Sequence, residues 1–335
     1  MDRDVTTRLW RDGVRQVEDF PLDQVSEHLA EDGALVWLDL CGPDHEQLQQ
    51  LADELGLDGH AVEDAVSFGE RPKATRHTNH TFVMTYATRL EQAPGSTELF
   101  QSRLHLTRIS AFVLPRGLVT VRSDDGFDMA AVVERWDENS DLLKLGPGAL
   151  LHGLLDVVVD GHFDAVQQLD DAIEDLEGAL FDGDVLTRET QQLTFRMRKE
   201  LVELRRVVLP MREVINTILR HRSELGHEGN AMDGWFADLY DHVLRAAEWT
   251  ESLRDMVTTI FETTLSLQDA RLNTIMKKLT AWAAIIAVPT AVTGWFGQNV
   301  PYPGFAQPLG LWLATGTISV LAVGLYLLFR RQDWL

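Results

Sequence analysis

The sequence predicts an α+β domain at the N-terminus, then long helices, and finally two C-terminal helices that cross a membrane. Three observations support this fold class. Strand-like and helix-like patterns alternate up to about residue 147, an unbroken helical period of apolar residues follows Gly148, and no Asp, Glu, Lys or Arg occurs from Leu279 to Phe329. We therefore divide the chain into residues 1–147, 148–278 and 279–335.

The composition restricts the classes of function. The chain has 335 residues, of which 45% are hydrophobic, and its formal net charge is −22. A protein that binds nucleic acid needs a basic surface to replace phosphate counterions, so we exclude nucleic acid as a partner and expect cations instead. The sequence contains no phosphate-binding loop, no nucleophile motif and no His-Glu-x-x-His. We therefore expect neither an enzyme nor an organic cofactor.

Two further features favour folding of most of the chain in the cytoplasm. Cys41 is the single cysteine, which excludes an internal disulfide framework and fits a reducing compartment. The N-terminal residues MDRDVTTRLWRDG are too charged for a secretory signal peptide.

The first part alternates between strands and helices. Residues Leu9 to Val17 contain an Asp-Gly pair that is typical of a hairpin turn, and Asp44 is the expected N-cap of an amphipathic helix that ends at Gly56. The predicted strands after the hairpin are Ala34–Leu40, Thr81–Leu90, Arg103–Leu114 and Leu118–Arg122.

Helices are predicted for residues 148–181, for 187–225 and from 233 onward. The last one is long, because no glycine occurs between Gly234 and Gly294 and the first proline after Met211 is Pro289. In a membrane helix Pro289 should only produce a kink. We therefore expect one continuous helix that runs into the membrane.

The charge-free segment is long enough for two membrane spans, about residues 279–297 and 309–329, because one span needs roughly 20 apolar residues. Basic residues flank the outer limits of this pair, namely Lys277, Lys278, Arg330 and Arg331. Because cytoplasmic flanks are enriched in Lys and Arg, we expect both chain ends in the cytoplasm and the lipid bilayer as a partner.

A stripe of acidic, hydroxylic and small residues follows the long helix at alternating spacings of four and three. Its members are Asp255, Thr259, Glu262, Ser266, Asp269, Asn273, Met276, Thr280, Ala283, Ala287, Thr290 and Gly294. This spacing keeps one face turned toward the axis of a parallel bundle, where an ordinary coiled coil has Leu, Ile or Val. The stripe is typical of helices around a narrow, partly wet lumen, with Glu262 and Asp269 as carboxylate rings that concentrate cations.

Small residues in a membrane helix are also typical of close helix packing, and this alternative stays open for the membrane part of the stripe. The carboxylates in the cytoplasmic part favour the lumen. Two spans in one chain do not easily enclose a pathway, so a lumen requires an oligomer.

Gly297, Gln298 and Asn299 follow the first span at its outer end. Gly297 permits a sharp exit from the helix, and the amide oxygen of Asn299 could accept hydrogen bonds from the hydration shell of Mg²⁺, which releases water reluctantly. The alternative is an Asn that caps the helix C-terminus.

The sequence resembles the CorA family of divalent-cation channels, whose signature is Gly-Met-Asn after the first of two C-terminal spans. Here the signature reads Phe296-Gly-Gln-Asn299. Other segments resemble the family in the same order: Glu63-Asp64 with Arg71-Pro-Lys73, Lys199–Val214, Trp235–His242 and Asn273–Met276.

The resemblance implies a homopentamer with a funnel-shaped cytoplasmic domain, an αβα lobe and one long pore helix per subunit. It also implies influx of Mg²⁺, and of Co²⁺ or Ni²⁺, across the cytoplasmic membrane. Asn299 would bind the hydrated ion, while Asn273 and Thr290 would line the pore. Asp238 would bind a regulatory cation between subunits, so that intracellular divalent cation closes the channel.

Two departures from the family pattern leave the transported ion open. Gln298 replaces the methionine of the signature, and the connection VPYPGFAQP has no acidic residue. The alternatives are a proton-coupled Zn²⁺ transporter of the same superfamily and a non-conducting, membrane-anchored cation sensor or scaffold. Neither span contains the His or Cys that a soft-metal site would use. His77 and His80 have a metal-like spacing, but they precede a predicted strand, and we interpret them as surface or structural residues.

Overall fold

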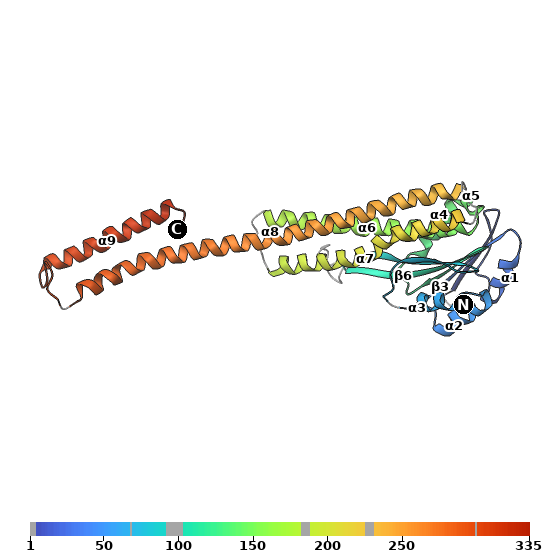
Figure 1. Cartoon of the computed structure of the whole chain (residues 1–335), viewed down its shortest axis with the longest axis horizontal. Helices are drawn as coiled ribbons and strands as arrows, with labels where there is room; N and C mark the ends of the chain where they lie inside the picture. The colour runs from blue at the N-terminus through green and yellow to red at the C-terminus, as the bar shows by residue number, and fades with distance from the viewer. Residues whose placement is uncertain (1–4, 68, 92–102, 182–187, 225–230, 299) are drawn as a thin grey trace. The chain divides into compact units, whose positions relative to one another are not determined.

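The computed structural model describes residues 5–67, 69–91, 103–181, 188–224, 231–298 and 300–335. Two compact units are found, Met1–Ile260 and Phe261–Leu335. Figure 1 shows the elements of both units.

A seven-stranded sheet is the centre of the first unit, with the strand order β2-β1-β3-β7-β6-β5-β4. Neighbouring strands are antiparallel except β3 and β7, which are parallel. The bounds are β1 Val5–Arg11, β2 Val14–Glu18, β3 Ala34–Cys41, β4 Lys73–Arg76, β5 Thr81–Glu91, β6 Arg103–Leu114 and β7 Gly117–Arg122. The predicted hairpin and the four strands predicted after it are confirmed.

The sheet is apolar on both faces because its central strands carry hydrophobic residues at consecutive positions. In β3, Trp37 belongs to one core and Val36 and Leu38 belong to the other. Figure 1 shows helices on both sides of the sheet. The core of Val36 contains α1 (Val25–Ala30), α2 (His45–Leu55) and α3 (Gly59–Val66), whereas the core of Trp37 contains α4 (Met129–Glu138) and the long helices. The first unit is therefore an αβα sandwich, as the family resemblance implied.

Local sequence signals set the ends of the predicted elements. Asp12 and Gly13 both have positive φ, at 51° and 76°, which is the conformation that a tight hairpin turn requires. The Asp44 carboxylate accepts a hydrogen bond from the Gln47 amide at 2.7 Å, and Gly56 ends α2 in the left-handed region at φ 65°. Both predicted signals are confirmed.

Several short elements were absent from the prediction: α1, α3, β4, α4, α5 (Ser140–Leu143) and a 3-10 turn, Leu22–Gln24. Most are too short for a clear apolar period. A signal was available for α3, because Asp58 accepts hydrogen bonds from the amides of His60 and Ala61 at 3.0 and 3.3 Å.

Three long helices follow the sheet: α6 (Pro147–Phe181), α7 (Arg188–Glu224) and α8 (Ala231–Phe296). They match the three predicted helices, and α8 continues through Pro289. A third hydrophobic core joins α6, α7 and α8 through residues that include Ile173, Leu204 and Val257. The helices therefore pack on one another as well as on the sheet.

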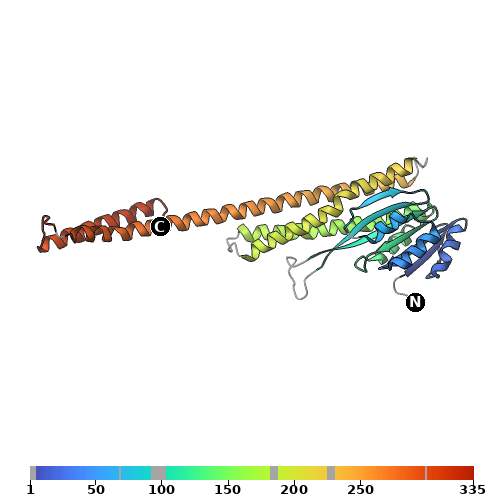
Figure 2. The same ribbon diagram turned by 60° about the horizontal axis from the view of Figure 1, so that its bottom comes forward.

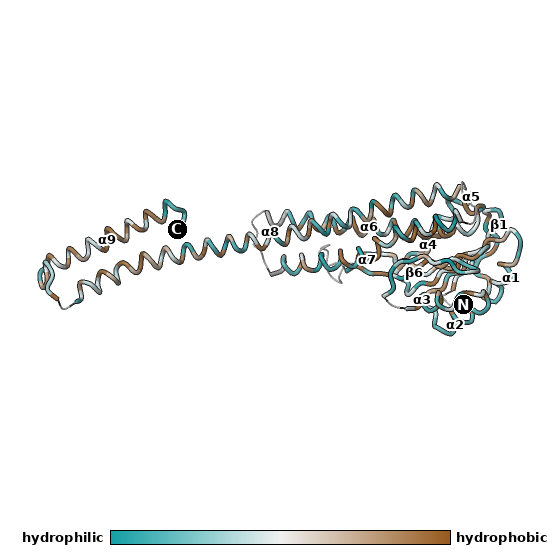
Figure 3. The backbone as a smooth tube through the Cα atoms, viewed as in Figure 1, coloured by the Kyte–Doolittle hydropathy of each residue, from teal (hydrophilic) through white to brown (hydrophobic). Residues whose placement is uncertain are grey.

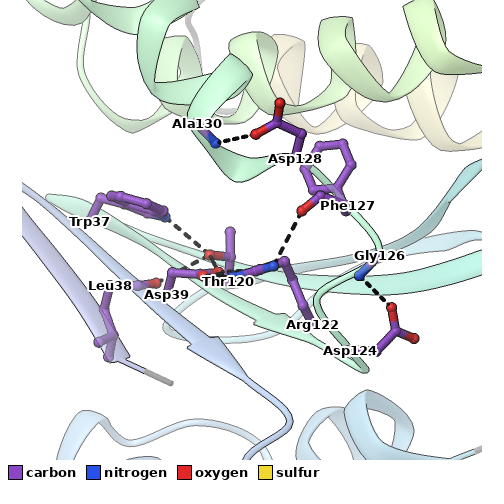
Figure 4. A network of polar contacts seen from close by, with 10 residues as sticks. All are labelled: Trp37, Leu38, Asp39, Thr120, Arg122, Asp124, Gly126, Phe127, Asp128 and Ala130. Atoms are coloured by element: carbon purple, nitrogen blue, oxygen red, sulfur yellow. Dashed lines mark hydrogen bonds and ion pairs between the residues drawn. The ribbon is translucent and has the colours of Figure 1, made fainter. Parts of the chain in front are cut away.

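A buried ion pair joins the parallel strands β3 and β7 (Figure 4). Asp39 is 2% exposed and accepts hydrogen bonds from Arg122 Nη2 at 2.7 Å and from Thr120 Oγ1 at 2.6 Å. Thr120 Oγ1 in turn accepts one from Trp37 Nε1 at 3.0 Å. Charges so far from water are stable only when they are paired and hydrogen-bonded. The prediction of β3 passed over this pair, although Asp39 is the one charged residue in ALVWLDLC.

His77 and His80 have the structural role that we predicted. Their rings stack with centroids 4.8 Å apart, and His80 also packs on Phe112 at 5.6 Å. Burial, and then the neighbouring His77, lower the pKa of His80.

The second unit contains the C-terminal part of α8 and the helix α9 (Pro308–Arg331). Figure 2 shows α9 returning beside the end of α8, and Figure 3 shows hydrophobic residues along α9 and along the end of α8 that lies beside it. Among the described residues, α8 and α9 are the two helices that are long and apolar enough to cross a membrane.

We predict that Asp39→Ala destabilises the protein far more than Asp32→Ala. Removing one partner of a buried ion pair leaves Arg122 buried and uncompensated, which costs about 3–5 kcal/mol. The control removes a carboxylate that also binds an arginine, Arg116, but is 95% exposed, and such a pair contributes about 0–1 kcal/mol. Thermal unfolding of the detergent-solubilised chain measures both. Equal shifts of the unfolding temperature would contradict the assignment.

Candidate functional site

The stripe on α8 lies on the surface of the chain over its whole length. All twelve members are exposed, from Asp255 in the first unit to Gly294 in the second. The members proposed to line a pore are Glu262, Asp269, Asn273, Met276, Thr280, Ala283, Ala287, Thr290 and Gly294. None of these nine is covered by the rest of its own chain.

In the second unit another face of α8 is covered. Ala281 is buried, and Ile285, Val288 and Val292 are half-buried. The stripe residues Ala283, Ala287, Thr290 and Gly294 each follow one of these four by two positions. Two residues correspond to a rotation of about 200° around an α-helix. The stripe and the covered face therefore lie on nearly opposite sides of α8.

The polarity of the stripe changes along the helix. Within the charge-free segment, the Thr290 hydroxyl donates to the Ile286 carbonyl at 3.4 Å, so its hydrogen is shared with the helix backbone. Toward the N-terminus of α8, the side chains of Glu262, Asp269 and Asn273 have no ion pair or hydrogen bond with any residue that the structure describes. Their oxygens are available to water, cations or another protomer.

Pro289 lies inside α8 without ending it. A proline has no N–H, so the carbonyl of Ile285 loses its usual donor. Thr293 Oγ1 donates to the carbonyl of Pro289 itself at 2.7 Å, and the helix continues to Phe296. The prediction that the helix passes this proline is confirmed.

The signature residues follow the end of α8 directly. The Gly297 amide donates to the Thr293 carbonyl at 2.9 Å, and the Gln298 amide donates to the Trp295 carbonyl at 3.3 Å. Both residues are exposed. Asn299, the predicted ion ligand, lies outside the described residues.

Asp238, the predicted regulatory residue, lies on the part of α8 that belongs to the first unit. Its side chain is 70% exposed, and His242 Nε2, one turn along the helix, lies 3.8 Å from Asp238 Oδ2. The structure therefore places Asp238 and the signature residues in different units.

A charged cluster on α4 and α6 was missed from the sequence. Arg135 makes ion pairs with Asp156 and Asp160, the latter at 2.8 Å. Burial raises the pKa of Asp156 although Arg135 opposes this shift, and burial lowers the pKa of His152, one turn away on α6. The signal was a pair of carboxylates four positions apart, Asp156 and Asp160, in the mostly apolar segment LLDVVVDGHF.

The described part of the chain contains no group of three or more His, Cys, Asp or Glu side chains that could hold a metal ion. A cation site built on Asp238, Glu262 or Asp269 would therefore need groups from another protomer or from water.

Comparisons with known proteins agree with this architecture. The cobalt/magnesium transport protein CorA of Thermotoga maritima is 28% identical over 302 residues, which cover 89% of this chain and 83% of that protein. The zinc transport protein ZntB of Cronobacter sakazakii is 26% identical over 312 residues, which cover 89% and 88%.

The solved structure of the CorA magnesium transporter from Methanocaldococcus jannaschii matches with a TM-score of 0.77 at 23% identity and covers 100% of both chains. This likeness shows the fold. The sequence also matches the family described as CorA-like Mg²⁺ transporter protein over residues 32–331. Since this match spans most of the 335 residues, the chain belongs to the CorA-like Mg²⁺ transporter protein family.

Proposed function

We propose that the chain forms a homopentamer that conducts divalent cations into the cytoplasm, driven by the membrane potential. Mg²⁺ is the proposed substrate, with Co²⁺ and Ni²⁺ as further cargo. The observation that carries the proposal is the position of the stripe on α8, which is exposed and nearly opposite the face that is covered in the second unit. Five copies arranged around the stripe would enclose a narrow polar path.

Each part of the stripe has a distinct physical role in this proposal. At the outer mouth, Gly297, Gln298 and Asn299 meet the hydrated ion, and amide oxygens bind its water shell without a fixed charge. Farther along the path, Gly294, Thr290, Ala287, Ala283 and Thr280 are small or hydroxylic and leave room for water. Met276, Asn273, Asp269 and Glu262 follow toward the cytoplasm, where the two carboxylate rings raise the local cation concentration.

The transported ion is assigned from the chemistry of the charge-free segment. Hydroxyl and amide groups are ligands for hard cations, whereas Zn²⁺ sites usually contain His or Cys. Residues 279–329 contain neither His nor Cys. This favours Mg²⁺, while the similarity to the zinc transport protein ZntB supports Zn²⁺ as the second candidate.

The proposed orientation follows from the flanking charges. Lys277 and Lys278 precede the first span, and Arg330 and Arg331 are at the end of α9. With both ends in the cytoplasm, the connection that contains residues 298–307 lies outside the cytoplasmic membrane.

Regulation is proposed to act through Asp238. Its exposed carboxylate is free to bind a divalent cation together with groups of a neighbouring protomer. Carboxylates that face one another across an interface repel unless a cation bridges them, so an occupied site favours the closed state. Loss of intracellular Mg²⁺ then permits opening.

Flux measurements in proteoliposomes test conduction and selectivity together. We expect Mg²⁺ uptake without a pH gradient, and loss of uptake in Asn299→Ala. Gln307→Ala is the matched control, because Gln307 is an amide in the same connection whose side chain does not cap α9. Zn²⁺ uptake that depends on a proton gradient would replace the first candidate with the second. A wild-type protein that assembles but moves no cation would indicate a sensor or scaffold.

The regulatory role predicts that Asp238→Ala keeps its flux when internal Mg²⁺ is high, because the bridging cation has lost its ligand. Asp241→Ala is the matched control, since Asp241 is also exposed and lies three residues away on the same helix. Its inhibition by internal Mg²⁺ should equal that of the wild type. Unchanged inhibition in Asp238→Ala would remove Asp238 from the mechanism.

A further inference from the structure

Tyr302 joins the connection between α8 and α9 to the last turn of α8. Its hydroxyl donates a hydrogen bond to the carbonyl of Phe296, the final residue of the helix, at 3.1 Å. Its ring packs edge-on against Phe296 at 5.0 Å and against Phe305 at 5.4 Å. We call these three aromatic residues the mouth clamp.

Two features of the sequence hold Tyr302 in place. It lies between Pro301 and Pro303, which have fixed φ angles and restrict the residues that precede them. The connection also touches α9 through two glycines, because a Cβ on Gly310 would lie 2.5 Å from the Gly304 carbonyl oxygen. The same Cβ would lie 3.7 Å from Tyr302 Cε2, so the ring borders α9 as well.

The hydrogen bond acts at a position that matters for an ion. The last carbonyls of an α-helix have no partner within the helix and carry partial negative charge. Here Gly297 and Gln298 donate to the carbonyls of Thr293 and Trp295, and Tyr302 donates to that of Phe296. The clamp therefore fixes the peptide unit that leads directly into Gly297.

We propose that Tyr302 is a positioning residue for the outer mouth, and that it sets the affinity for the hydrated divalent cation by orienting Gly297 and Gln298. This inference rests on the proposed function. Without the hydroxyl, the Phe296 carbonyl becomes free to turn and to attract water or cations. Gly297 and Gln298 then adopt several orientations. Because only one of these binds the ion well, the affinity for the ion falls.

Tyr302→Phe tests the hydroxyl alone, because the variant keeps the ring and its packing. Tyr326→Phe is the control, since Tyr326 is an exposed residue on α9. Hydrogen exchange of the full-length protein in lipid nanodiscs reports on the clamp without any need for transport. We expect faster exchange of the Gly297 and Gln298 amides in Tyr302→Phe only, with an unchanged unfolding temperature for both variants.

Mg²⁺ flux then tests the functional part. The half-saturating external Mg²⁺ concentration should rise about three- to tenfold in Tyr302→Phe, the effect of one hydrogen bond, whereas the maximal flux should change little. Exchange rates and half-saturation that both equal those of the wild type would overturn the inference. If wild-type liposomes show no flux, the proposed function fails, while the exchange rates still decide whether the clamp exists.

Discussion

The division of the C-terminal part of α8 into two faces is the constraint on which the functional interpretation depends. One face, which includes Ala281, Ile285 and Val288, is buried or half-buried within the chain. The opposite face carries hydroxylic and small residues that gain little from contact with hydrocarbon. In a bilayer this second face is stable when it meets water or its own copies. A single chain supplies neither, and this is the physical reason for the proposed assembly of several chains.

The first unit is subject to a different physical constraint, the burial of polar groups. Its sheet is covered on both faces, so polar groups near the centre must be paired within the protein. Asp39 and Arg122 meet this requirement between β3 and β7, and Asp156 on α6, whose side chain is only 16% exposed, meets it by pairing with Arg135. The same unit contains the start of α8, where Phe236, Leu239 and Val243 pack into the core and leave Asp238 exposed. Burial on one side of this helix segment thus determines which residues remain accessible.

Most of the fold was predictable because its long elements carry sequence patterns, either of apolar spacing or of missing charge, that extend over more than about ten residues. The period of three and four identified α6, α7 and α8, and the absence of charge identified α9. Caps and turns such as Asp44, Gly56 and Asp12-Gly13 fixed local boundaries. The short helices α1 and α4 were missed because few residues define their period. The family resemblance, which rested on segments spread over the chain, is confirmed.

The candidate site was less predictable, for physical reasons. Spacing located the stripe, because its members recur on one helix. Spacing could not reveal which face of α8 is covered in the fold. The partnership of Tyr302 with Phe296 depends on how the connection folds back, and the pairing of Asp39 with Arg122 joins strands that are distant in the sequence. Tertiary contacts of this kind are difficult to predict from the residue types and their spacing alone.

The most direct test of the central claim is disulfide cross-linking in membranes, after Cys41→Ser has removed the single cysteine. Thr290→Cys places a thiol on the stripe, and Trp295→Cys places one five residues later, about 140° around the same helix. Both positions are exposed in the single chain. A disulfide requires Cβ atoms about 3.5–4.5 Å apart, which only residues near a common axis approach. A pore lined by the stripe predicts oxidative cross-links between protomers for Thr290→Cys and little more than background for Trp295→Cys. Cross-links for Trp295→Cys alone, or for neither variant, would contradict a pore lined by the stripe.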